Sequence, residues 1–339
     1  MRKRLGALSP RKLAFILGSI VLYILVLAVL LVLFNMEEEP TQAVFGSMED
    51  RFRSDVQMEH QGEVYSYREN EITNYLILGV DHQNTGRSTG YQSGGQSDFL
   101  VVLSIDRVRR TITPLMLDRD TMAPVHTFGI FGNPSGTRQM QLCLAHAYSG
   151  PDTSSNQNTV DTVEALLHGI EIHHFIAMSM PAVPVLNDAL GGVVITLEDD
   201  FSSYDPAMVP GATVHLMGEQ AEFFVRGRLT VADGTNASRM RRQQQYVEAF
   251  LELMKQEMDK DTDDVASRLL DAVSTHTETD ASRDILLRDI QSYENYHWLP
   301  LRTLEGTHAI DEYGFAEFWP DEEALRSLIA DIWFTKEEH

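Results

Sequence analysis

The sequence predicts an α/β domain, with a mixed central sheet sandwiched by helices, preceded by one N-terminal transmembrane helix. Residues 13–34 run for 22 positions without a charged side chain. From residue 74 onward, short continuous apolar runs typical of buried strands alternate with segments whose apolar residues are spaced three and four apart, as in helices. Glycine and proline mark many of the boundaries. Alternation of this kind is typical of helices packed on a sheet.

The N-terminal segments indicate a cytoplasmic head (residues 1–12) and an uncleaved signal anchor (13–34). The head carries five Lys and Arg residues and no acid. At about 1.5 Å rise per residue, the apolar run is long enough to cross a hydrocarbon core of about 30 Å, and it is longer than that of a cleaved signal peptide. Basic charge before the run and acidic charge after it predict a single-pass protein of the cell membrane, with a cytoplasmic N-terminus and an extracytoplasmic main domain.

Charge and cysteine content exclude some functions for the part beyond the anchor. Removing the five basic residues of the head leaves 22 basic against 50 acidic residues. Nucleic acid is therefore not an expected partner, because binding it requires broad basic surface. Cys143 is the only cysteine, so the chain cannot form an internal disulfide.

The first elements of the domain follow a predicted stalk, residues 35–70, which lacks a sustained apolar period. A buried strand, a loop rich in Gly, Ser and Thr, and two further strands are then expected at 74–80, 82–97, 98–106 and 111–117. The tetrapeptide RVRR joins the last two strands, which predicts an antiparallel hairpin. Pro114 is typical of an edge strand or a bulge.

Helical and extended segments alternate up to residue 258, the expected end of the main domain, 71–258. Helices are expected at 159–169, 181–192, 218–228 and 238–258, and strands at 174–180 and 193–197. Ser238 is a candidate cap for the last of these helices. Residues 259–339 form a helical and aromatic-rich extension that ends in an amphipathic helix.

Five arginines lie within seventeen residues of this acidic chain. Arg239 and Arg242 are three apart, so they share a face in the first turn of a helix, where the backbone already favours an anion. Arg226 and Arg228 stand at the end of the preceding helix. Without counter-charges these groups would repel one another, so acids from elsewhere in the fold or an anionic ligand must compensate them. Guanidinium groups match phosphate oxygens in bidentate geometry, and beside a membrane this predicts a lipid phosphate or pyrophosphate.

Two acids flank the first loop. Asp81 follows one predicted strand and Asp98 begins the next, so neighbouring strands would place both carboxylates at one edge of the sheet. Two carboxylates together with phosphate oxygens suit Mg²⁺ or Mn²⁺. The alternative interpretation is that both are turn and cap residues, a common use of aspartate.

The chain resembles the LytR–CpsA–Psr family through an ordered set of segments: NYLILGVD, SDFLVVLSID, ITPLMLDRDT, LAHAYSG, VLNDALGGVVITL, LMGEQAEFFVRGR and SRMRRQQQYVEAF. These segments cover residues 74–258, and the most specific part is VRGR followed by SRMRRQ. The resemblance implies a membrane-anchored phosphotransferase of a mainly Gram-positive group. It would move a glycopolymer such as teichoic acid or capsule from a polyprenyl pyrophosphate carrier to peptidoglycan. It also implies an α/β sandwich with an apolar groove, although the apolar runs at 158–190 and 243–258 fit ordinary core equally well.

The resemblance also implies roles for individual residues. Asp81 and Asp98 match acids that hold Mg²⁺ at the pyrophosphate, and either could accept a proton from the attacking hydroxyl group. The positions that match pyrophosphate-binding arginines are Arg119, Arg226, Arg228 and Arg239, and Arg242 matches a further family position. The implied catalytic set is thus Asp81, Asp98 and Arg119.

Four positions depart from the family pattern. Gln96 stands where an arginine is usual, Asn236 in place of an aspartate, Cys143 in place of an asparagine, and Asp118 in place of a proline. Such a divergent member could have reduced activity or an altered acceptor. Two rival functions therefore stay open: a non-catalytic polyprenyl-phosphate binder that regulates envelope assembly, and a hydrolase that cleaves the pyrophosphate-linked glycan with water.

Overall fold

The computed structural model describes residues 57–81, 95–150, 153–227 and 236–337, together with Val231 and Gly234. All of them belong to one unit, Val44–His339. The expected head, anchor and much of the stalk lie outside the described residues, as does Arg228. Among the described residues, no helix combines the length and the apolar character needed to cross a membrane.

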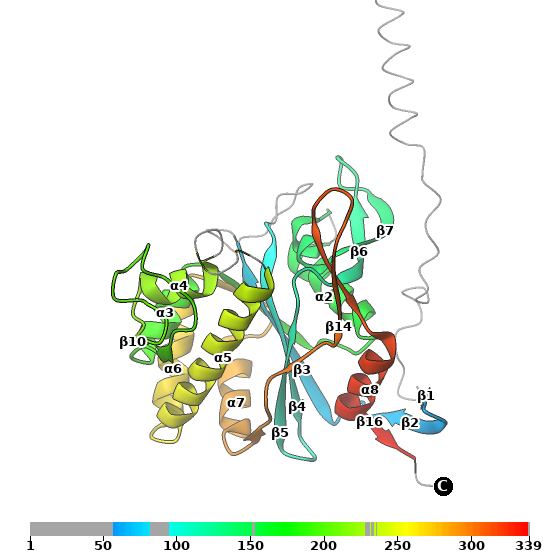
Figure 1. Ribbon diagram of the computed structural model, residues 1–339. Coiled ribbons are helices and arrows are strands. Elements are labelled where there is room, and N and C mark those ends of the chain that lie inside the picture. The colour runs from blue at the N-terminus through cyan, green and yellow to red at the C-terminus, as the bar shows by residue number, and fades with distance from the viewer. Residues whose placement is uncertain are drawn as a thin grey trace, which may run out of the picture. The chain divides into compact units, whose positions relative to one another are not determined.

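A seven-stranded mixed sheet forms the centre of the domain (Figure 1). Its order is β11-β8-β3-β4-β5-β12, with β13 also paired to β5. The strands are β3 (Ile72–Val80), β4 (Ser97–Asp106), β5 (Thr111–Leu117), β8 (His174–Ser179), β11 (Thr277–Thr279), β12 (His297–Trp298) and β13 (Arg302–Thr303). β4 is antiparallel to both β3 and β5, whereas β8 is parallel to β3. The predicted mixed sheet is confirmed.

The β4–β5 hairpin is antiparallel, as predicted, and its register places Asp106 opposite Thr111. On its other side β5 pairs with β12 at Thr111 and Ile112 and with β13 at Leu115 and Met116. Pro114 lies between these two short pairings. Since proline has no N–H group to donate, it fits where the ladder is interrupted.

Helices cover both faces of the sheet, as predicted. One face packs against η1 (Leu142–Ala147), α2 (Ser155–Leu166) and α8 (Glu322–Trp333) in the largest hydrophobic core. The other face lies opposite α3 (Ala182–Ala189), α5 (Asn236–Met258), α6 (Thr262–Val273) and α7 (Arg283–Tyr293). α5 begins at Asn236, so Ser238 lies inside its first turn instead of capping it, and its hydroxyl accepts a hydrogen bond from Arg241.

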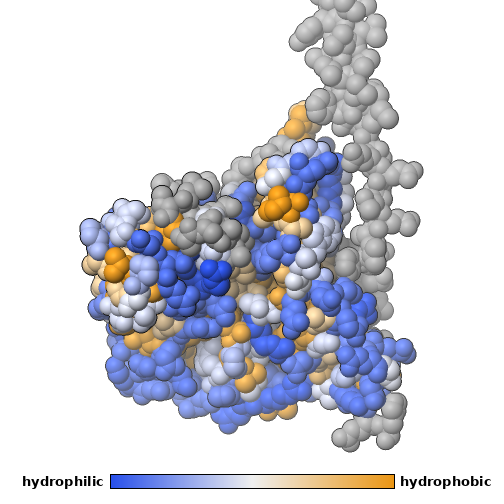
Figure 2. All heavy atoms as spheres, viewed as in Figure 1, coloured by the Kyte–Doolittle hydropathy of each residue, from blue (hydrophilic) through white to orange (hydrophobic). Residues whose placement is uncertain are grey.

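The two ends of the described chain join one small sheet. β1 (Gln57–His60) pairs with β2 (Glu63–Tyr67), which pairs with β16 (Phe334–Lys336). The described part of the expected stalk is therefore extended and contains no helix. The remaining strand pairs are β6 (Met122–Phe128) with β7 (Pro134–Gln141), β9 (Val194–Thr196) with β10 (Thr213–His215), and β14 (Gly306–Ile310) with β15 (Ala316–Pro320). Hydrophilic side chains cover most of the face seen in Figure 2, where apolar ones surface in small patches.

Candidate active site

An apolar groove of about 440 Å³ runs between the sheet and helices α3, α5, α6 and α7. Alternate residues of the strands form its floor, because successive side chains of a strand point to opposite faces. The floor includes Ile77, Phe99, Val101, Leu103 and Ile176, and the α5 side of the wall includes Val247, Phe250, Leu251, Met254 and Met258. A groove with this lining suits a hydrocarbon chain.

Asp98 lies at one end of the groove and joins two arginines. Its Oδ1 atom accepts a hydrogen bond from Nη1 of Arg119, and its Oδ2 atom lies 3.3 Å from Nη1 of Arg239. Only 16 % of the Asp98 side chain is exposed, against 12 % for Arg119 and 7 % for Arg239. The structure thus brings together three residues that lie far apart in the sequence, from β4, the β5–β6 connection and α5.

Arg119 is held from several sides. Its Nη2 atom lies 2.5 Å from Oε1 of Gln96 and 2.9 Å from Sγ of Cys143, and its Nε atom lies 3.3 Å from Oδ1 of Asp120. Burial alone would lower the pKa of Arg119, but its neighbours Cys143, Asp98 and Asp120 raise it above the ordinary value. Burial raises the pKa of Cys143 to about 12, against the opposing effect of Arg119, so at neutral pH the thiol is protonated. Gln96 and Cys143 therefore position the guanidinium group.

Asp81 and Arg226 form the solvent-facing part of this end. The backbone N–H of Asp81 donates to the carbonyl of Gln96 at 2.9 Å, which places both acids at the same sheet edge. Nη2 of Arg226 lies 3.2 Å from Oδ1 of Asp81, and its Nη1 lies 3.0 Å from Oε1 of Glu222. About half of each side chain is exposed, 48 % for Asp81 and 51 % for Arg226. This pair therefore faces water, unlike the buried pairs of Asp98.

The carboxylates at this sheet edge could bind a hard cation only together with oxygen atoms from a bound ligand. Among the residues that the structure describes, no group of three His, Cys, Asp or Glu side chains could hold a metal ion. Asp81 and Asp98 supply oxygen donors alone, and Mg²⁺ is commonly bound by one or two carboxylates together with phosphate oxygens and water. Two carboxylates next to a pyrophosphate would meet that requirement.

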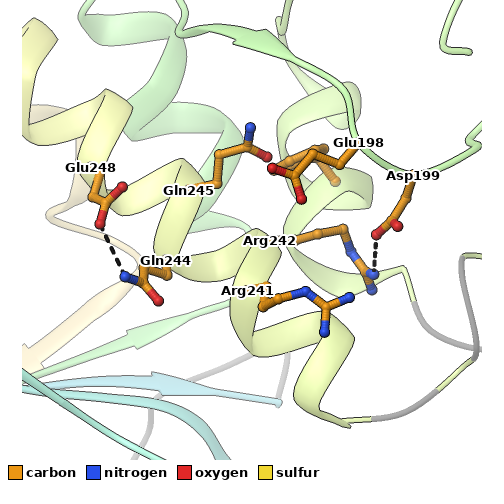
Figure 3. A pocket seen from close by; sticks show the side chains of 8 residues that line it. Glu198, Asp199, Arg241, Arg242, Gln244, Gln245 and Glu248 are labelled. Carbon is orange, nitrogen blue, oxygen red and sulfur yellow. Dashed lines mark hydrogen bonds and ion pairs between the residues drawn. The ribbon is translucent and has the colours of Figure 1, made fainter. Parts of the chain in front are cut away.

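Arg242 lies apart from this cluster. Only 4 % of its side chain is exposed; Nη1 lies 2.9 Å from Oδ2 of Asp199, and Nη2 donates to the carbonyl of Gly227. It lines a second pocket, of about 370 Å³, on another side of α5 (Figure 3). The other charged and amide side chains of that pocket are Glu198, Asp199, Arg241, Gln244, Gln245 and Glu248. Arg242 therefore ties α5 to the end of α4 (Glu219–Arg226), where Arg226 stands.

The partners of the arginines differ in how far the sequence points to them. Glu222, an acid close to Arg226 in the sequence, stands four residues before it, a spacing that brings side chains together on a helix. Asp199 and Asp120 carry no such local signal. Their contacts with Arg242 and Arg119 depend on how distant segments pack.

Comparison with known proteins identifies relatives over most of the chain. The model of the LytR_cpsA_psr family matches residues 41–326. A protein of Halalkalibacterium halodurans named polyisoprenyl-teichoic acid--peptidoglycan teichoic acid transferase TagU is 30% identical over 209 residues, which are 62% of this chain and 61% of that protein. A protein of the same name from Oceanobacillus iheyensis is 27% identical over 286 residues, 84% of this chain and 82% of its own length.

The fold is also similar to solved structures. The crystal structure of protein gbs0355 from Streptococcus agalactiae has a TM-score of 0.60 and 22% sequence identity, and the match covers 78% of this chain and 87% of that one. This likeness shows a shared α/β fold. Because the family model matches far more than half of the residues, the chain belongs to the LytR_cpsA_psr family.

Proposed function

We propose that this protein is a membrane-anchored phosphotransferase that moves a phospho-linked glycopolymer from a polyprenyl pyrophosphate carrier to peptidoglycan. The observation that carries the proposal is the apolar groove that ends at Asp98, Arg226 and Arg239. A ligand that fits both parts has a long hydrocarbon chain and an anionic headgroup. The names of the relatives, which are teichoic acid transferases acting on peptidoglycan, support the donor and acceptor classes.

The arginines would bind the headgroup. Arg226 and Arg239 line the end of the groove, and Arg119 lies next to it, bound to Asp98. A guanidinium group can donate two parallel hydrogen bonds to phosphate oxygens. The phosphates would take over hydrogen bonds that now go to Asp81 and Asp98. The hydrocarbon chain would lie along the floor of the groove, so burial of the chain would fix the position of the pyrophosphate.

The transfer step needs an acceptor hydroxyl group and a leaving phosphate. The hydroxyl oxygen attacks the phosphorus on the sugar side and forms a new P–O bond. The bond from that phosphorus to the bridging oxygen breaks, and polyprenyl phosphate leaves with the electron pair. The arginines stabilise the negative charge that develops on the departing phosphate, and positioning contributes most of the rate.

Asp81 is the better placed acceptor for the hydroxyl proton. Both oxygens of Asp98 face guanidinium groups, whereas only Oδ1 of Asp81 has a partner among the residues that the structure describes, and half of its side chain is exposed. A carboxylate within reach of the hydroxyl group can act as a general base. Asp81 and Asp98 would also hold Mg²⁺, or Mn²⁺, which supplies positive charge to the pyrophosphate oxygens.

A transfer assay with the full chain in detergent micelles tests the proposal. The mixture contains Mg²⁺, a labelled glycan on a polyprenyl pyrophosphate, and peptidoglycan fragments. Arg226→Ala should lower the transfer rate about 10- to 100-fold, because a hydrogen bond to a charged group contributes about 1.5–3 kcal/mol. Arg268→Ala is the matched control, since Arg268 also pairs with an acid one turn earlier but lies away from the groove.

The products distinguish the rival functions. A label that becomes linked to peptidoglycan supports transfer. Release of free phospho-sugar by the wild type identifies a hydrolase, and tight lipid binding without turnover identifies a regulatory binder. Equal activity of the Arg226→Ala and Arg268→Ala variants would remove the arginine site from the proposal.

A further inference from the structure

The groove has two chemically different ends. Along β4 its floor extends from Phe99 to Ile105, and the six steps between these residues span about 20 Å at 3.4 Å per step. The first end holds Asp98 and the arginines. The opposite end, the distal end, lies where β4 turns into β5, and its lining includes three aromatic residues, Tyr293, Tyr296 and Trp298. A hydrocarbon chain whose headgroup met the arginines would therefore extend toward the distal end.

An exposed basic turn adjoins the distal end. The four residues RVRR, 107–110, connect β4 to β5, and all four are exposed. Val108 is 66 % exposed although it is apolar. The guanidinium group of Arg107 donates to the carbonyl oxygens of Asn70 and Glu71, and that of Arg110 lies 5.5 Å from the centre of the Tyr296 ring. Positive charge is thus gathered at this turn of a strongly acidic protein.

The carboxylate of Asp106 fixes the conformation of this turn. Oδ1 of Asp106 accepts hydrogen bonds from the backbone N–H groups of Val108 and Arg109, at 3.0 and 2.8 Å. The same carboxylate forms a buried pair with Arg68, with 2.6 Å between Oδ2 and Nη1. Arg110 has a φ of 54°, in the left-handed region that favours glycine. Short hairpin connections commonly place one residue in this region.

The aromatic residues of the distal end are only partly buried. Amphipathic rings of tyrosine and tryptophan gather where hydrocarbon meets polar headgroups. The N-terminal part of the described chain also lies at the distal end. Arg68, which directly follows β2, pairs there with Asp106 at the end of β4. Residues 35–56 connect this region to the 22-residue apolar segment of the sequence.

We propose that the distal end docks on the outer leaflet of the membrane, with the turn 107–110 against anionic headgroups and Val108 and the aromatic residues at the edge of the hydrocarbon. The isoprenoid chain could then pass from the bilayer into the groove without crossing water. This inference rests on the proposed function for the presence of a lipid in the groove. Arginines and a lone exposed valine at the apolar end of a groove suit a lipid surface, since anionic headgroups attract basic side chains.

A second apolar surface provides the control. The tips of the β6–β7 and β14–β15 hairpins expose Phe131 (80 %), Ile130 (71 %) and Tyr313 (77 %). They point to the opposite end of the domain from the β4–β5 turn (Figure 1), and none of these three residues lines the groove. If apolar exposure alone decided docking, these tips would be the part in contact with the membrane.

Fluorescence quenching by brominated lipid distinguishes the two surfaces. The full chain would be reconstituted in vesicles containing phosphatidylglycerol with bromine near the headgroup end of the acyl chains. In a Trp298→Phe, Trp319→Phe background, the remaining Trp333 is fully buried and its emission, recorded without a reporter, is subtracted. Val108→Trp then places a reporter on the turn, and Phe131→Trp places one on a hairpin tip. Emission of the turn reporter should fall at least about twofold relative to unbrominated vesicles, and that of the tip reporter should not change. Quenching of the tip reporter alone, or of neither reporter, would overturn the proposal.

Changing the three arginines tests the electrostatic part. Replacing Arg107, Arg109 and Arg110 by Gln should restore most of the emission of the turn reporter. The same triple variant should transfer glycan from a vesicle-embedded donor about tenfold more slowly, yet use a short-chain donor in detergent at the wild-type rate. Equal loss with both donors would overturn the docking role. If the wild type transfers from neither donor, the proposed function fails, whereas the quenching result still decides where the membrane is contacted.

Discussion

Asp98→Asn should destabilise the fold much more than Asp81→Asn, although both changes should impair transfer. Asp98 neutralises Arg119 and Arg239, whose side chains are 12 % and 7 % exposed. Removing one partner of a buried ion pair costs about 3–5 kcal/mol, because the charge that remains loses a counter-charge in a poorly solvated site. The Asp81–Arg226 pair is half exposed, where a pair contributes about 0–1 kcal/mol.

These energies predict melting temperatures that calorimetry can separate. For a domain of about 280 residues, an unfolding entropy of about 2.1 cal/mol/K per residue gives a total of about 590 cal/mol/K. The Tm should therefore fall by about 5–9 °C in Asp98→Asn and by less than about 2 °C in Asp81→Asn. Scans of the full chain in detergent at neutral pH test this. Similar shifts in both variants would refute the assignment of Asp98 as the buried counter-charge.

The same variant provides a test of headgroup binding that does not depend on turnover. In Asp98→Asn the amide that replaces the carboxylate carries no charge to compete with an anion for Arg119 and Arg239. Inorganic pyrophosphate should then raise the Tm of Asp98→Asn more than that of the wild type, in which the anion must compete with the carboxylate. A smaller rise in the variant would indicate that pyrophosphate binds elsewhere.

Three further predictions follow from buried groups. Burial alone would raise the pKa of Asp106, but hydrogen bonds from Arg68 and from backbone N–H groups outweigh this effect and hold the pKa below 3.8. Asp106→Asn should therefore lower the free energy of unfolding by about 3–5 kcal/mol in urea titrations at pH 7. The difference between the variant and the wild type should shrink as the pH falls below 3.8. Cys143 is fully buried and has a pKa raised to about 12, so iodoacetamide should label it at pH 8 only after unfolding in urea, as mass spectrometry can show. Burial lowers the pKa of His126 below 6.5, so below pH 6.5 the unfolded chain takes up a proton that the folded chain does not, and the folded state loses stability. His126→Gln should therefore flatten the decline in unfolding free energy between about pH 7 and 5.

Much of the central sheet could be predicted because its strands carry their own local signals. Continuous apolar runs marked β3, β4 and β5, and the turn RVRR joined two of them. β12 and β13 have two residues each, which is too short for any periodicity. The pairing of β16 with β2 joins residues more than 260 positions apart, and the sequence pattern of neither strand predicts the strand with which it pairs.

The groove could not be separated from ordinary core by sequence pattern. Residues 243–258 show the same apolar spacing whether their helix packs directly on the sheet or leaves room for a ligand. Only the volume that remains between α5 and the strands distinguishes the two, and it depends on the placement of α3, α6 and α7. Of the two predicted apolar runs, the one on α5 lines the groove and the earlier one is divided. Its Val160, Val163 and Leu166 belong to the core on the opposite face, whereas its Ile176 and Leu186 line the groove.

The arginine cluster shows how a small rotation changes a residue's surroundings. Residues three apart on a helix were expected to share a face, yet at about 100° per residue they differ by 60° in direction. That difference leaves Arg239 in the groove beside Asp98, while Arg242 contacts Asp199 on another side of α5. Spacing in the sequence therefore identified the helix that carries the charges, but not which acid each arginine would meet.

The buried ion pairs at Asp98 also bear on how a headgroup could be released. A pyrophosphate that meets uncompensated arginines would bind tightly to an already assembled site, and its product would leave slowly. Here Arg119 and Arg239 already have a carboxylate between them, so binding exchanges one set of hydrogen bonds for another and the net gain is smaller than the sum of the new contacts. On the proposed mechanism, Asp98 would take back these hydrogen bonds when polyprenyl phosphate leaves. The acid would then keep two like charges together without a ligand and limit the affinity for the product, a combination that suits turnover better than storage.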